Sequence, residues 1–254
     1  MDEWFTALLA GLACGFVDSS LGMGYGVTSA TLLVAFGIAP AIASASVHTS
    51  EMIVDVVSAL SHYRLRNVEF RPLKPLLFSG VLGAVSGALF LVYIAGLGFA
   101  KPYVRTVLLI MGATILYKHT SGWRKQETSK VQWKNKHLSL LGFFAGFIDV
   151  SGGGGWGPIM TPIFIMKGSN PRRAVGTVEF TEPLISLAGV LTFGFLIGFE
   201  TFLWSIVMPM ILGGIILTPF AAWLVKKTPR KALGIAIGSW LIALNLYALV
   251  AAYL

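Results

Sequence analysis

Ionisable residues line one face of an otherwise apolar segment at residues 41–62. His48, Glu51, Asp55 and His62 follow steps of three, four and seven residues, a spacing that places them on one side of a helix. Charged groups at membrane depth are costly unless they are paired or hydrated, and they usually mark the pathway of an ion or a polar substrate. The alternative is structural, with His48 or a hydroxyl group capping broken backbone.

A second apolar segment, at residues 172–195, repeats this pattern and favours the functional interpretation. It carries Glu179, Glu182 and Ser186 at the matching registers. Burial favours the neutral form of a carboxyl group, so Glu51, Glu179 or Glu182 could carry a proton. The candidates for substrate binding on these two segments are His48 and the hydroxyl-bearing residues Thr49, Thr177 and Thr181.

Two glycine-rich strings precede these segments, from Gly15 to Gly26 and from Gly146 to Gly157. Both read Gly-Phe-x-Asp-x-Ser-x-Gly-x-Gly-aromatic-Gly, and they are offset by 131 residues. The same offset pairs Pro40 with Pro171 and Glu51 with Glu182. Such a match at a fixed offset indicates an internal duplication.

Each string interrupts an apolar stretch, 4–37 or 138–168, that is too long for one membrane-spanning helix. Irregular backbone at this depth is tolerated only inside protein or beside a water-filled cavity, and a helix N-terminus after the break would attract an anion. The alternative is that the glycines only permit close helix packing. The substrate-binding candidates in the strings are Ser19, Ser20, Gly22, Gly24, Tyr25, Gly26, Ser151, Gly153, Gly155, Trp156 and Gly157.

The aspartates of the strings stand near the C-terminal ends of the first helical arms, where a negative charge opposes the helix dipole. Asp18 and Asp149 are therefore expected to make a hydrogen bond, to take part in ion coupling or to cap the opposite arm. The candidates for proton or ion coupling are Asp18, Glu51, Asp55, Asp149, Glu179 and Glu182.

The composition places the chain in a lipid bilayer. Of 254 residues, 56% are hydrophobic and 12% are charged, against about 25% charged in soluble domains. The net charge of +8 comes from residues between the apolar segments, which indicates membrane topology and not nucleic-acid binding. The chain begins Met1-Asp2-Glu3 without a basic n-region, so we expect its first apolar segment to be retained.

Four basic loops, at 64–74, 118–137, 167–173 and 226–231, distinguish two topologies. Eight plain spans would place them on both faces of the membrane, whereas two re-entrant hairpins place all of them on the cytoplasmic face. We therefore predict an all-α polytopic membrane protein of two inverted repeats joined by a basic cytoplasmic linker at 119–137. The first repeat, 1–118, contains a hairpin at 4–37 and spans at 41–62, 75–95 and 102–118; the second, 138–254, contains a hairpin at 138–168 and spans at 172–195, 202–225 and 232–252.

With its duplicated string, a downstream Pro-x-x-Ala and the step Val175-Gly176-Thr177, the chain resembles the TauE/SafE sulfite exporter family, also called the 4-toluene sulfonate uptake permease family. The resemblance covers most of the chain. It implies a multi-pass protein of a bacterial or archaeal cytoplasmic membrane that moves sulfite, sulfoacetate, thiosulfate or a related organosulfonate, often by export. The residues by themselves indicate only a small anion.

Other function classes remain as alternatives. A passive anion channel would use the same cavity, and an intramembrane enzyme would need a nucleophile with a base or a paired-aspartate site. The chain has no Gly-x-Ser-x-Gly string, and Asp18 and Asp149 do not stand in Gly-x-Gly-Asp strings. We expect no enzymatic activity, no catalytic residue, no cofactor and no metal, and the oligomeric state, a homo-oligomer included, stays open.

Overall fold

The protein is a bundle of helices, seen in a computed structural model that describes residues 3–121, 134–224 and 230–250. Within these ranges every regular element is helical. The helices are α1 Glu3–Leu21, α2 Tyr25–Ala35, α3 Pro40–Arg64, α4 Leu73–Gly96, α5 Ala100–Thr120, α6 Asn135–Gly152, α7 Trp156–Met166, α8 Pro171–Ile197, the short 3-10 helix η1 Phe199–Thr201, α9 Trp204–Leu224 and α10 Arg230–Val250.

The glycine strings break the two long apolar stretches into unequal arms. The sequence predicts arms of about 14 residues each, by halving the stretch, but α1 has 19 residues and α2 has 11. The second copy divides in the same way, with 18 residues in α6 and 11 in α7. The equal division is wrong for two reasons. The first stretch turns at Gly22 and Gly24, past its middle, and in the second copy α6 begins at Asn135, before the predicted stretch, while the turn with positive φ angles at Gly153 and Gly154 shortens the second arm.

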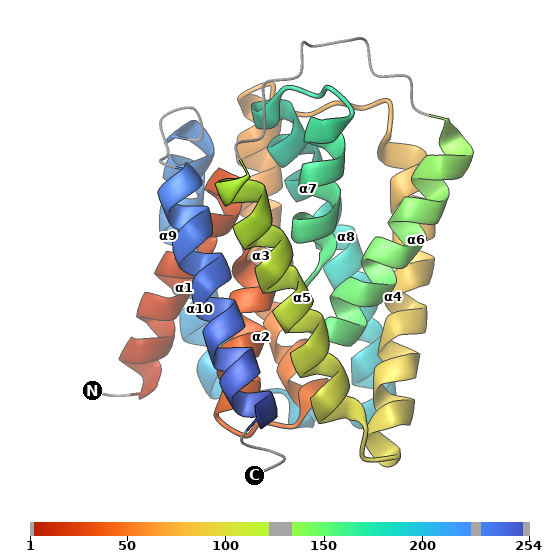
Figure 1. Ribbon diagram of the computed structural model, residues 1–254, viewed down its shortest axis with the longest axis vertical. Coiled ribbons are helices and arrows are strands. Elements are labelled where there is room, and N and C mark those ends of the chain that lie inside the picture. The colour runs from red at the N-terminus through yellow and green to blue at the C-terminus, as the bar shows by residue number, and fades with distance from the viewer. Residues whose placement is uncertain (1–2, 122–133, 225–229, 251–254) are drawn as a thin grey trace.

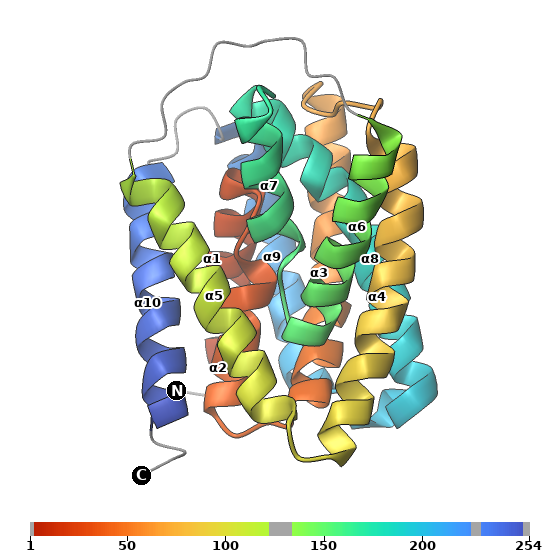
Figure 2. The ribbon, with the colours of Figure 1, turned by 45° about the vertical axis from the view of Figure 1, so that its right-hand side comes forward.

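Each broken pair turns back toward the end of the molecule from which it started. In Figures 1 and 2, α6 begins at the upper end and α7 returns to it, whereas α1 begins at the lower end and α2 returns there. The turn between α3 and α4 and the turn between α7 and α8 both lie at the upper end. Most of the predicted linker 119–137 and of the basic loop 226–231 falls outside the described residues.

The main helix pairs are α1 with α9, α4 with α6, α3 with α8 and α5 with α10. Glycines allow the backbones of two of these pairs to approach closely. A Cβ at Gly15 would lie 2.8 Å from the Cα of Gly214, and one at Gly83 would collide with the carbonyl oxygen of Phe143. Small residues at helix crossings are typical of membrane bundles.

The distribution of apolar side chains is that of a protein surrounded by lipid. Phe78 and Phe195 are 74% and 86% exposed on the periphery, while Asp18, Glu51 and Glu179 are buried in the middle. Four helices, α1, α4, α8 and α9, are long and apolar enough to cross a membrane by length and composition. Helix α3 is 25 residues long, and its row of buried polar groups lowers its apolar content.

Candidate functional site

At each of the two breaks, the aspartate before the break accepts a hydrogen bond from the helix after it. Asp18 Oδ1 accepts a hydrogen bond from the backbone N–H of Tyr25 at 3.2 Å, and Asp149 Oδ1 accepts one from Trp156 at 2.9 Å. Tyr25 and Trp156 are the first residues of α2 and α7. Each aspartate therefore lies in the last turn of one helix, and its carboxyl group contacts the N-terminus of the next helix. The partial positive charge of that N-terminus stabilises a carboxylate.

The two breaks also contact each other. Thr161 Oγ1 donates a hydrogen bond to the carbonyl oxygen of Gly22 at 2.6 Å. A Cβ at Gly26 would stand 3.0 Å from both the Cα of Gly154 and Oε1 of Glu51. The glycine strings of the two halves, far apart in sequence, thus form one buried centre, and only residues without side chains fit at these contacts.

Helices α3 and α8 bring their polar faces to this centre. One ligand atom each from Glu51, Asp55 and Glu182 lies within 4.8 Å of the others, and the same holds for Asp18, Glu179 and Glu182. All five side chains are at least 97% buried. The face predicted from the spacing of three and four residues is therefore a single cluster, joined by Glu182.

His48 connects this cluster to the second break. Its Nε2 lies 3.2 Å from Oδ2 of Asp149 and 3.9 Å from Oε2 of Glu51, while Nδ1 lies 2.8 Å from the carbonyl oxygen of Ser44. Oxygen atoms face both ring nitrogens, an arrangement in which a doubly protonated imidazole can donate from each nitrogen. In that form His48 neutralises one carboxylate.

Many oxygens in and beside the cluster have no hydrogen-bond partner among the described residues. They are Oδ2 of Asp18, Oε2 of Glu51, both carboxyl oxygens of Asp55, Oε1 of Glu179, Oε2 of Glu182 and the hydroxyl of Ser186. A buried polar group without a partner is costly, and a buried carboxylate without a counter-charge is more costly still. A proton, an ion or a polar substrate at these oxygens would relieve that cost.

Several candidates from the sequence make hydrogen bonds within the protein. Thr177 Oγ1 accepts a hydrogen bond from the backbone of Glu69, Thr49 Oγ1 donates to the carbonyl of Ala45, and Ser20 Oγ donates to the carbonyl of Val17. Ser151 pairs with the hydroxyl of Tyr103 at 2.7 Å. Trp156 is fully buried and donates from Nε1 to Oγ1 of Thr181 at 3.0 Å.

Sequence reasoning missed Ser58. Its hydroxyl donates to Oε2 of Glu179 at 2.6 Å and lies 2.9 Å from Oγ of Ser19. The signal was present, because Ser58 follows Asp55 by three residues and so extends the same helix face. His62, further along this face, contacts the carbonyl oxygen of Ser19 through Nε2 and the side chain of Asn67 through Nδ1.

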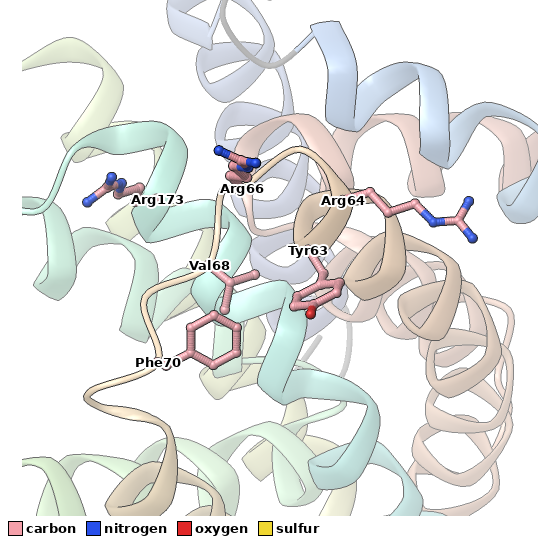
Figure 3. A pocket seen from close by; sticks show the side chains of 6 residues that line it. All are labelled: Tyr63, Arg64, Arg66, Val68, Phe70 and Arg173. Atoms are coloured by element: carbon pink, nitrogen blue, oxygen red, sulfur yellow. The ribbon is translucent and has the colours of Figure 1, made fainter.

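A separate cavity of about 430 Å³ opens at the end of the molecule where α3 ends and α8 begins. Figure 3 shows Tyr63, Val68 and Phe70 gathered together, with Arg64, Arg66 and Arg173 around them. The rings of Tyr63 and Phe70 meet edge to face with centroids 6.1 Å apart. We call this arginine-rimmed cavity the basic mouth; the sequence predicts its basic loops but not the cavity.

Comparison with known proteins identifies the family to which this apolar bundle belongs. The family model for the sulfite exporter TauE/SafE matches residues 7–248. The chain is 41% identical over 237 residues to the probable membrane transporter protein YtnM of Bacillus subtilis (strain 168), covering 92% of this chain and 79% of that protein. No solved structure matches the chain significantly. The chain therefore belongs to the TauE/SafE sulfite exporter family and is a membrane transporter of that type.

Proposed function

We propose that the protein is a secondary transporter that exports a small sulfur-containing anion across the cytoplasmic membrane, with sulfite, thiosulfate, sulfoacetate and related organosulfonates as candidate substrates. The observation that carries the proposal is the meeting of two broken helices beside a buried carboxyl cluster. Secondary transporters commonly bind substrate and coupling ion at such breaks, near the middle of the membrane. The family description, a sulfite exporter, supports the sulfur chemistry.

The proposed architecture is a pair of inverted repeats, 1–118 and 138–254. Under the 131-residue offset, α1 corresponds to α6 and α4 to α9, and the observed pairs α1 with α9 and α6 with α4 exchange under this correspondence. The broken pairs open toward opposite ends of the molecule. Such an arrangement supports alternating access, in which each half in turn closes one side of a shared site.

The anion is proposed to bind at the two breaks, with Ser19, Thr181 and the backbone around Gly24 and Gly155 as its candidate ligands. Asp18 and Asp149 already occupy the first N–H group of each second arm. Because ionised carboxylates would repel the substrate, we propose that protons neutralise part of the cluster when the anion binds. The basic mouth attracts anions from the cytoplasm toward this site.

The coupling test uses purified protein in liposomes and an organosulfonate whose charge is fixed over the pH range. A pH gradient should drive its movement in the wild type. Glu51→Gln and Glu182→Gln should retain exchange but lose the response to the gradient, whereas the exposed control Glu200→Gln should keep it. Flux of the wild type that ignores the pH gradient would show that proton coupling is wrong.

The binding test uses the glycines of the breaks. Gly24→Val and Gly155→Val should abolish saturable flux through added bulk, because a Cβ at these positions already lies 3.0 Å from Val17 Cγ1 and 3.1 Å from Ile148 Cγ2. The control Gly96→Val, where a Cβ would meet nothing within 4 Å, should transport normally. Unchanged substrate affinity in both break variants would mean that the glycines serve helix packing only. A wild-type conductance far above the rates of carriers would indicate a channel.

A further inference from the structure

The offset of 131 residues relates two contacts that join the halves of the protein. His48 of α3 faces Asp149 of α6, and the matching positions are Glu179 of α8 and Asp18 of α1. In the first contact a histidine meets a carboxylate at 3.2 Å. In the second, two carboxyl groups face each other, within a set of ligand atoms no more than 4.8 Å apart. The first contact contains a side chain that can carry a positive charge, whereas the second contains carboxyl groups alone.

We propose that Asp18, Glu179 and Glu182 form a site for a hard metal cation of the size of Na⁺ or Ca²⁺, which takes the place that the His48 imidazolium fills in the matching contact. This inference rests on the proposed function in one respect, which is that the cation accompanies the transported anion. It goes beyond the sequence, which predicts no metal.

The donor set selects the class of cation. All the ligand atoms are oxygens, which suit hard cations and not soft transition metals. The ligand atoms lie within 4.8 Å of one another, close enough for one cation to contact oxygens of all three residues. Magnesium keeps several waters and demands shorter bonds, so a fully buried site disfavours it.

Two observations outside the acidic trio point to a ligand in the same place. The hydroxyl of Ser186 is fully buried and has no hydrogen-bond partner among the residues that the structure describes. Ser186 follows Glu182 by four residues and therefore lies on the same face of α8. The hydroxyl of Ser58 already contacts Glu179, which fixes one carboxyl oxygen and leaves Oε1 without a partner. In the part of the chain that the structure describes, the ion-pair contacts of the cluster are those of His48.

The test measures thermal denaturation of the purified full chain in detergent, followed by tryptophan fluorescence, while choline chloride is replaced by NaCl or CaCl₂ at constant ionic strength. We expect a saturable rise in Tm with Na⁺, Ca²⁺ or both, of about 5–10 °C at a hundredfold excess over Kd. KCl and MgCl₂ should give smaller shifts. No selective, saturable shift with any of these cations would overturn the proposal.

Glu179→His copies the charge arrangement of the first half into the second. This variant should fold without added cation and should lose the cation-dependent rise in Tm, because the imidazolium occupies the site. Asp18→Asn should weaken the response at least tenfold in apparent Kd, and the distant control Glu200→Gln should retain it. A full response in Glu179→His would contradict the assignment of the site.

The outcome separates this site from the transport proposal. Cation-dependent Tm without sulfonate flux in liposomes would support the site and reject the proposed function. Sulfonate flux with no cation-dependent Tm would reject the site and leave the proposed function in place.

Discussion

His48 shows how a single residue decides the charge of the centre. Its imidazole ring lies between Asp149 and Glu51 and is completely buried. Removing one partner of a buried ion pair leaves the other without a counter-charge, whereas removing both partners avoids that penalty. The pair therefore matters mainly because it prevents Asp149 from being buried without a counter-charge, and it adds little net stability.

A double-mutant cycle tests this role. His48→Gln should lower the free energy of unfolding by about 3–5 kcal/mol, seen as a lower Tm in detergent. Combining it with Asp149→Asn should cost clearly less than the sum of the two single substitutions, because the residues interact directly. His137→Gln, at an exposed histidine, is the control. Additive effects of the two single substitutions would mean that the pair does not act as a unit.

The residue scale also shows what sequence can and cannot predict. Helical spacing placed His48, Glu51 and Asp55 on one buried face, because a period of three and four residues fixes the direction of side chains. It could not show that His48 meets Asp149, which lies 101 residues away. That pairing depends on which helices pack together, and local periodicity carries no information about it.

At the scale of the helices, the duplicated glycine strings predicted two breaks but not their geometry. The exact point of each break follows from glycines with positive φ angles, which sequence alone does not distinguish from glycines inside a helix, such as Gly15 and Gly146. For Asp18 and Asp149 the sequence predicts a hydrogen bond, a role in ion coupling or a cap on the opposite arm. The structure shows a hydrogen bond between each aspartate and the opposite arm.

Glycines between helices also make a testable contribution to packing. Gly83→Ala would force a methyl group into the carbonyl oxygen of Phe143 on α6, so we expect a loss of about 1–3 kcal/mol, typical of overpacking. Gly96→Ala, at the end of the same helix, meets nothing within 4 Å and should change stability by less than about 0.5 kcal/mol. Thermal denaturation in detergent compares the two, and equal melting temperatures would exclude close α4–α6 packing as the reason for Gly83.

At the scale of the whole molecule, the positions of the loops define a topology that can be measured. Single cysteines at Arg71 and Lys167, in a Cys14→Ser background, should react only with a reagent on the cytoplasmic side. A cysteine at Leu97, at the opposite end of α4 and 54% exposed, should react only from outside. Labelling of Arg71 and Lys167 from opposite sides would restore the topology of eight plain spans.

The basic mouth should affect the capture of substrate more than its passage. Arg64→Gln with Arg173→Gln should raise KM for a sulfonate several-fold and leave kcat nearly unchanged, because the arginines attract the anion before it reaches the carboxyl cluster. The effect should shrink at high salt, where surface charges are screened. Lys101→Gln, which removes a basic residue at the other end of the molecule, is the control. A fall in kcat at unchanged KM would place these arginines in a later step.

The repeated aspartate hydrogen bond, from Asp18 to Tyr25 and from Asp149 to Trp156, has an evolutionary consequence. Because the arrangement is present twice, the residues beside one copy can change while the other copy keeps its own. At the matching positions next to the two aspartates the chain carries His48 in one half and Glu179 in the other, so the two halves of the duplication have diverged in chemistry at this contact.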